Sequence, residues 1–295
     1  MSKFRILSFD GGGIKGVCSA TLLQRIHDEC PQFLDKVDLF AGTSTGGLIA
    51  LCLANGMPID SIKDIYVADG TAIFKRNWRH FCGLTGSKYT NRGLKKVVCK
   101  AFGDLHLGDL SRKVLVSSFD LKSDKPPRDW KPKFFHNFGD DRDDPYLVSD
   151  VALYTSAAPT YFRAVDGFID GGVVANNPSM AAVCQALDDR YGEDLEVDDI
   201  TLLSIGTGST HENISDDSYD FGMFNVSKIV SIMLNGTESV PDYQCRVILK
   251  DSYFRIDPED SKNTKMDDVE AIPHLIEIAE NFPIQPVVSW LKANW

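Results

Sequence analysis

One serine in this 295-residue sequence stands in a setting that favours nucleophilic chemistry. Gly42-Thr43-Ser44-Thr45-Gly46 matches G-x-S-x-G, in which a sharp turn between a strand and a helix exposes a serine hydroxyl above a sheet. An apolar segment precedes the motif at 37–41, and another follows it at 48–55, as this turn requires. Gly42 and Gly46 suit the crowding of such a turn. A glycine-rich loop that only packs a helix on a sheet is the alternative interpretation.

A second glycine-rich segment, DGGGIKG at 10–16, also satisfies G-x-G-x-x-G, the fingerprint of dinucleotide-binding folds. That use needs an acidic residue at the end of the next strand, where this sequence has Leu39-Phe40-Ala41-Gly42. The better use of Gly11, Gly12 and Gly13 is to direct backbone N–H groups at an oxyanion that forms beside Ser44. A dinucleotide-binding module remains a rival hypothesis, which cofactor titration would test.

Asp170 is the candidate partner of the serine. Ile169-Asp170-Gly171-Gly172 ends an apolar segment with an acid and two glycines, which leave room for another backbone or a ligand. An aspartate that merely starts a tight turn is the alternative. A nucleophilic serine usually works with a histidine. Of the six histidines, only His211 and His274 follow Asp170, as the Ser, Asp, His order of α/β-hydrolases requires.

The elements that must position these residues alternate between strands and helices. Such alternation predicts a mostly parallel sheet, covered by helices on both faces, with the site at the carboxyl ends of its strands. Because positions 10, 44 and 170 must meet, we expect a single domain over residues 1–295. The predicted strands are 4–9, 37–41, 114–119, 134–138, 167–169, 200–205 and 244–249, and the predicted helices are 14–30, 48–55, 91–101, 148–157, 179–189, 226–234, 268–281 and 285–293.

Composition narrows the classes of protein to consider. With 43% hydrophobic and 25% charged residues, the chain is that of a globular protein with a sizeable core. A net charge of −11 disfavours nucleic acid as a partner. The N-terminus lacks the pattern of a signal peptide, and seven scattered cysteines without a C-x-x-C pair fit a reducing cytoplasm. The longest uncharged stretch, 39–59, contains glycines and a proline and is not expected to span a membrane.

Together these segments resemble the patatin-like phospholipase family, from Phe4 to about Gly208. In that family a D-G-G-G-x-x-G loop, a G-x-S-x-G turn and a D-G-G segment occur in this order. Three further segments are similar: 152–162 resembles A-S-x-A-x-P-x-x-F, and Asn176-Asn177-Pro178 and 204–208 also match familial patterns. The resemblance implies a three-layer α/β/α patatin-like fold with a mostly parallel central sheet. It further implies a Ser-Asp dyad of Ser44 and Asp170 and an oxyanion hole at Gly11, Gly12 and Gly13.

The activity that the resemblance implies is hydrolysis of acyl esters in glycerophospholipids or lysophospholipids, through an acyl-enzyme on Ser44 and with neither cofactor nor metal. A free aspartate, with a pKa of about 3.9, is a poor base at neutral pH, so partial burial would have to raise the pKa of Asp170. The rivals are an α/β-hydrolase with a Ser-Asp-His triad and a catalytically idle binding or storage protein.

The expected partner is a phospholipid membrane surface or lipid aggregate, reached from the cytoplasm as a peripheral protein. The sequence does not identify an activating ligand or protein partner. Segments 75–81 and 128–133 interleave cations with aromatic residues, which suits a membrane interface. The acidic run 140–144 lacks the spacing of a calcium loop and is expected to be a solvated charge run.

Overall fold

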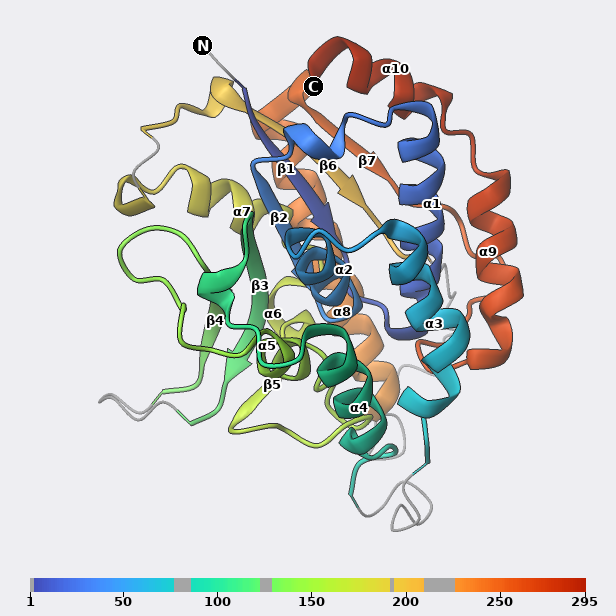
Figure 1. Cartoon of the computed structure of the whole chain (residues 1–295). Helices are drawn as coiled ribbons and strands as arrows, with labels where there is room; N and C mark the ends of the chain where they lie inside the picture. Colours follow the sequence, from blue (N-terminus) through green and yellow to red (C-terminus); the bar gives the residue numbers. More distant parts are fainter. Residues whose placement is uncertain (1–2, 77–85, 123–128, 192–193, 210–225) are drawn as a thin grey trace.

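A computed structural model describes residues 3–76, 86–122, 129–191, 194–209 and 226–295 (Figure 1). Its strands form one sheet in the order β4-β3-β2-β1-β6-β7, with β5 paired to β3. Neighbouring strands from β3 through β2, β1 and β6 to β7 are parallel, whereas β4 and β5 both run antiparallel to β3. The strands are β1 (Phe4–Phe9), β2 (Leu39–Thr43), β3 (Lys113–Asp120), β4 (Lys131–His136), β5 (Phe168–Asp170), β6 (Ile200–Ile205) and β7 (Tyr253–Ile256).

Helices cover both faces of this sheet, as predicted. On one face α2 packs on β1, β2 and β3, and α1 packs beside it with α3 and α9; on the other, α7 and α8 pack on β1, β6 and β7 (Figure 1). The helices are α1 (Gly16–Glu29), α2 (Thr45–Ala54), α3 (Ile59–Ile73), α4 (Asn91–Phe102), α5 (Val148–Thr155), α6 (Gly172–Ala175), α7 (Ser179–Ala186), α8 (Val226–Leu249), α9 (Ile272–Asn281) and α10 (Gln285–Asn294).

Alternation along the strands divides the core into two layers. In β1, Ile6 joins the cluster under α7 and α8, whereas Leu7 joins the larger cluster under α1, α2 and α9. In β6, Leu202 and Leu203 separate in the same way. Because successive side chains of a strand point to opposite faces, a strand buried on both sides reads as a continuous apolar run. The three-layer α/β/α fold is thereby confirmed.

One predicted element is wrong. The sequence predicts a strand at 244–249, but this segment is the end of α8, and the strand follows at β7. Cys245 and Leu249 are buried while the residues between them are exposed, which is the four-residue spacing of a helix face. The short run of β-branched residues favours a strand locally, but the segment forms a helix because it packs against β6 and β7. Helix α3 and the single turn of α6 were not predicted.

Most other predicted elements are confirmed within a few residues of their bounds. Most of segment 75–81 lies outside the described residues, as does His211. In the described part of the chain, no helix has the length and apolar character needed to cross a bilayer.

Candidate active site

Ser44 occupies a strained turn between β2 and α2. Its φ of 54° and ψ of −120° lie outside the regions that a residue with a Cβ prefers. The turn is held from both sides, since the Ser44 N–H donates to Thr155 Oγ1 at 2.7 Å and the Ser44 carbonyl accepts the Leu48 N–H at 3.0 Å. A backbone strained in this way persists only when its surroundings constrain it, and such residues concentrate at functional sites.

Glycine is required at the two flanking positions of Ser44 because there is no room for a side chain. A Cβ on Gly42 would lie 2.1 Å from the carbonyl oxygen of Gly46, and one on Gly46 would lie 2.3 Å from the carbonyl oxygen of Phe9. Both clashes are with backbone, which cannot rotate away as a side chain can. The turn therefore closes tightly on the end of β1, where the glycine loop begins.

Asp170 meets Ser44 from β5. The β5 strand pairs antiparallel with β3 and places Asp170 opposite Ser118, and the preceding residue Ser117 pairs with Thr43 of β2. Asp170 is 3% exposed and accepts the Gly172 N–H at 2.7 Å on Oδ1, and the nearby Ser44 hydroxyl favours its ionised form. The sequence-predicted pair thus comes together, although the strand that carries Asp170 is antiparallel to its neighbour.

Burial sets the proton affinity of this carboxyl. It raises the pKa of Asp170 to about 6, against the lowering effect of the hydrogen bonds from Ser44 and Gly172. The acid therefore stays ionised at neutral pH while being a far better proton acceptor than an exposed aspartate. Gly171 and Gly172 make the burial possible: a Cβ would lie 2.2 Å from Ser117 Oγ on Gly171 and 2.5 Å from Leu234 Cδ2 on Gly172.

The three glycines after β1 differ in what their N–H groups do. The Gly11 N–H donates to the carbonyl oxygen of Asn176 at 2.9 Å, whereas the N–H groups of Gly12 and Gly13 have no acceptor among the described residues. Gly12 and Gly13 line the same cavity as Ser44, and a Cβ on Gly11 would lie 3.4 Å from the Ser44 Cβ. Two backbone donors are therefore free beside the serine, at the beginning of a helical segment that favours an anion.

Remote segments shape this loop. Gly13 has a φ of +60°, and a Cβ there would lie 2.3 Å from the carbonyl oxygen of Met266, which accepts the Ile14 N–H at 2.8 Å. Thr207 Oγ1 donates to the Gly11 carbonyl at 3.1 Å. The Lys15 ammonium, which is buried, donates to the carbonyl oxygen of Gly208. Met266 lies in a part of the sequence where no motif pointed to the site.

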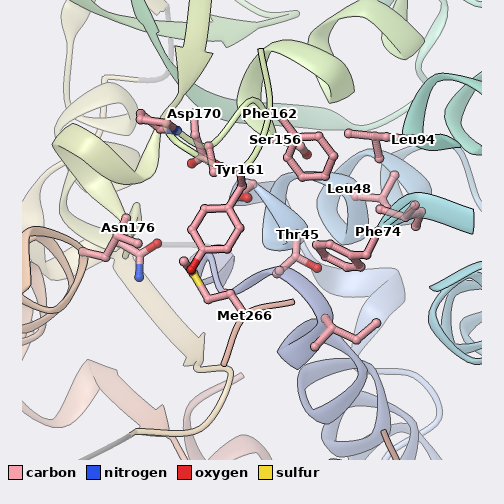
Figure 2. Close-up of a pocket in the computed structure, with 18 of the residues that line it drawn as sticks. Thr45, Leu48, Phe74, Leu94, Ser156, Tyr161, Phe162, Asp170, Asn176 and Met266 are labelled. Atoms are coloured by element: carbon pink, nitrogen blue, oxygen red, sulfur yellow. The ribbon is translucent and has the colours of Figure 1, made fainter. Parts of the chain in front are cut away.

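A cavity with mainly apolar walls opens at Ser44 and Asp170. Figure 2 shows Leu48, Phe74, Leu94 and Phe162 gathered on one side of it and Asp170 and Asn176 on the other. Helix α8 contributes Val230 and Leu234, which sequence reasoning did not single out. The remaining lining residues are Gly12, Gly13, Ile14, Thr45, Tyr66, Ile73, Ser156, Ala158, Pro159, Tyr161, Val173 and Met266.

Histidine is not part of this arrangement in the described residues. None lines the cavity, and His274, one of the two triad candidates, has its Nε2 3.1 Å from Asp260 Oδ1. The described chain holds no group of three or more His, Cys, Asp or Glu side chains arranged to bind a metal. In the acidic run, Arg142 pairs with Asp144 at 2.7 Å and Lys133 pairs with Asp143, so several of its charges are paired.

A strained serine turn, a buried aspartate and an apolar cavity at one edge of an α/β sheet define a hydrolase of lipid-like esters as the class of protein. The chain belongs to the patatin-like phospholipases, whose family profile matches residues 7–183, and membership implies lipid acyl hydrolase activity. CotR of Bacillus subtilis is 32% identical, and the alignment covers 100% of this chain and 99% of CotR.

Other similar proteins match shorter parts or only the structure. A cGAMP-activated phospholipase of Escherichia coli is 32% identical over 70% of this chain and 62% of its own length. Among solved structures, VipD of Legionella pneumophila matches 100% of this chain and 67% of VipD, with a TM-score of 0.49 and 12% identity.

Proposed function

We propose that this protein hydrolyses acyl esters of glycerophospholipids or lysophospholipids with Ser44 as nucleophile and Asp170 as general base. One observation carries the proposal: Ser44 and a buried carboxyl, Asp170, whose pKa is raised to about 6, line the same apolar cavity. Serine and aspartate then work as a dyad, and no histidine is needed. The family to which the chain belongs gives the reaction class.

In the proposed acylation, Asp170 accepts the proton of the Ser44 hydroxyl as Oγ bonds to the ester carbonyl carbon. The carbonyl oxygen becomes an oxyanion, which the free N–H groups of Gly12 and Gly13 bind. Asp170 then gives the proton to the departing alcohol oxygen as the C–O bond breaks, leaving an acyl-enzyme. Water, deprotonated by Asp170, attacks that ester, and the fatty acid leaves as Ser44 recovers its proton.

Gly11 has a supporting part in this proposal. Its N–H is bonded to Asn176, so it anchors the loop while Gly12 and Gly13 provide the donors. Gly42, Gly46, Gly171 and Gly172 supply the close approaches that hold Ser44 and Asp170 together.

The cavity supports a lipid substrate. Its apolar side chains suit an acyl chain, whose transfer from water contributes roughly 0.8 kcal/mol for each CH₂ that is buried. We propose that the substrate is presented by a membrane surface or lipid aggregate and that the protein binds there peripherally from the cytoplasm. Neither cofactor nor metal is part of the proposed reaction, and full activity in a chelator is the expected result.

The decisive test is covalent labelling by a fluorophosphonate. We expect the probe to label the wild-type chain and Ser44→Ala to abolish labelling and ester hydrolysis, because the phosphonate captures only an activated hydroxyl. Ser156→Ala is the matched control, since Ser156 lines the same cavity and should leave labelling unchanged. Labelling that persists in Ser44→Ala would move the nucleophile elsewhere.

A lipid panel tests the substrate class. Release of fatty acid from phospholipids and lysophospholipids should depend on Ser44, while an equal amount of triacylglycerol should be hydrolysed more slowly. Because relatives are named cGAMP-activated phospholipases, we propose an activating ligand for this chain as well, and the panel is run with and without cGAMP and with cell extract. Hydrolysis confined to soluble esters under every condition would contradict the phospholipid assignment.

A further inference from the structure

A buried cluster of charges lies behind the glycine loop, on the face of the sheet that α7 and α8 cover. The Nη2 of Arg255, on β7, is 2.7 Å from Asp10 Oδ2, 3.0 Å from Glu238 Oε1 and 3.0 Å from Asp257 Oδ2. Its Nη1 donates to Ser204 Oγ at 2.9 Å. The side chains of Arg255 and Asp10 are 7% and 0% exposed. The cluster therefore joins β1, β6, β7 and α8 in a setting where charge interactions are strong.

This cluster reaches the glycine loop by two routes. Asp10 is the residue directly before Gly11. Glu238 Oε2 accepts a hydrogen bond from Asn176 Nδ2 at 3.1 Å, and the carbonyl oxygen of Asn176 accepts the Gly11 N–H at 2.9 Å. A Cβ on Gly11 would lie 2.2 Å from Asn176 Oδ1, so Asn176 packs directly against the loop. Through Asn176, a carboxylate on α8 is linked to the position of the free donors.

We propose that Glu238 and Arg255 are positioning residues, which hold the glycine loop through Asn176 and Asp10, and that protonation of Glu238 loosens this hold. The inference rests on the proposed function, in which Gly12 and Gly13 bind the oxyanion. Neither Glu238 nor Arg255 touches the cavity, so their effect on the reaction is indirect.

The charges around Glu238 make its protonation state sensitive to pH. Three carboxyls share one guanidinium, and Lys15 is the second cation that acts on Glu238. Burial raises the pKa of Glu238 to about 7, with a further increase from Asp257, while Arg255, Lys15 and the Asn176 hydrogen bond oppose it. Burial also raises the pKa of Asp10. Glu238 therefore gains a proton as pH falls through about 7.

The ionised form of Glu238 is the one that holds Asn176 best. Its two oxygens each face a donor, the Arg255 guanidinium on Oε1 and the Asn176 amide on Oε2. A protonated carboxyl turns one of those oxygens into a donor, so one of the two bonds is weakened or lost. Glutamine imposes the same conflict permanently, which makes Glu238→Gln a stable mimic of the protonated state.

The experiment compares kcat and KM of the wild type and Glu238→Gln on p-nitrophenyl butyrate between pH 5.5 and 8.5. At pH 8.5 we expect kcat of the variant to be about tenfold lower with KM unchanged, because oxyanion donors act in the transition state. The wild-type to variant ratio of kcat should fall toward one at pH 5.5, where Glu238 is protonated. A purely structural contribution would give a ratio that does not depend on pH.

Asp242→Asn is the matched control, because Asp242 lies one turn further along α8 and bonds to Arg246 and Tyr253 rather than to Asn176. Its ratio should stay near one throughout. If Glu238→Gln misfolds by circular dichroism, Glu238→Asp keeps an ionisable group and should retain the pH-dependent step.

A flat ratio, or a loss confined to KM, would overturn the positioning role while leaving Ser44-dependent hydrolysis intact. Absence of Ser44-dependent hydrolysis in the wild type would overturn the proposed function and this inference with it.

Discussion

The serine turn and the glycine loop lie side by side, yet they are held in different ways. The turn is shaped mainly by its own neighbours, since Gly42 lies against the Gly46 backbone and the Ser44 carbonyl oxygen accepts the Leu48 N–H. The loop is shaped by residues that are far away in sequence, namely Asn176, Thr207 and Met266. A site can therefore combine a locally determined nucleophile with donors whose geometry depends on the whole fold. Changes to the first should abolish the site, and changes to the second should tune it.

The largest effect is expected from Gly42→Ala. The new Cβ would lie 2.1 Å from the Gly46 carbonyl oxygen, so the turn must open or the strand must shift, at a cost of about 3 kcal/mol. Thermal unfolding should show the loss, and fluorophosphonate labelling should disappear. Gly236→Ala on α8 is the control: a Cβ there meets nothing within 4 Å, and alanine favours a helix. A stable, labelled Gly42→Ala protein would refute the steric account of the turn.

Asp170→Asn should remove much of the activity without the loss of stability that is expected for Gly42→Ala. Removing the base should lower kcat by roughly 10²- to 10⁴-fold. In the wild type, kcat should fall as pH drops through about 6, because the pKa of Asp170 is raised to about 6.

The contribution of Asp170 to folding stability should depend on pH in the opposite sense to its contribution to kcat: it should increase as pH drops. A carboxyl whose folded pKa is raised favours folding below its unfolded pKa and loses that contribution as pH rises through the folded value. Asp170→Asn should thus be more stable than wild type at pH 8, by about 3 kcal/mol, with the difference vanishing near pH 4.

His274→Ala should leave kcat nearly unchanged, since its ring faces Asp260. A thousandfold loss of kcat in a folded His274→Ala protein would contradict the dyad and indicate a Ser-Asp-His triad.

The smallest effect concerns the loop. Thr207→Val keeps the shape but removes the hydroxyl that donates to the Gly11 carbonyl, so we expect kcat to fall by about three- to tenfold with KM and melting temperature nearly unchanged. Thr21→Val removes a buried hydroxyl that bonds only within α1, and its kcat should match the wild type. Equal behaviour of the two variants would mean that the loop needs no support from Thr207.

How far sequence reasoning reaches can be seen from individual residues. Short motifs predicted Ser44, its flanking glycines and Asp170, because a tight turn or a buried acid demands particular residue types at fixed spacing. They also predicted the alternating strands and helices, since burial on both faces produces continuous apolar runs. The same local reasoning misplaced 244–249, where β-branched residues favour a strand and only the packing of Cys245 and Leu249 on the sheet makes a helix.

By itself, then, the sequence determined the proposed nucleophile and base and the family of folds that carries them. Tertiary structure alone decided which glycine N–H groups are free, that α8 lines the cavity through Val230 and Leu234, and that Arg255 gathers three carboxylates behind the loop. The physical reason is separation along the chain. A steric demand within five residues leaves a pattern that can be read, whereas a hydrogen bond between residues 176 and 238 leaves none until the sheet brings them together.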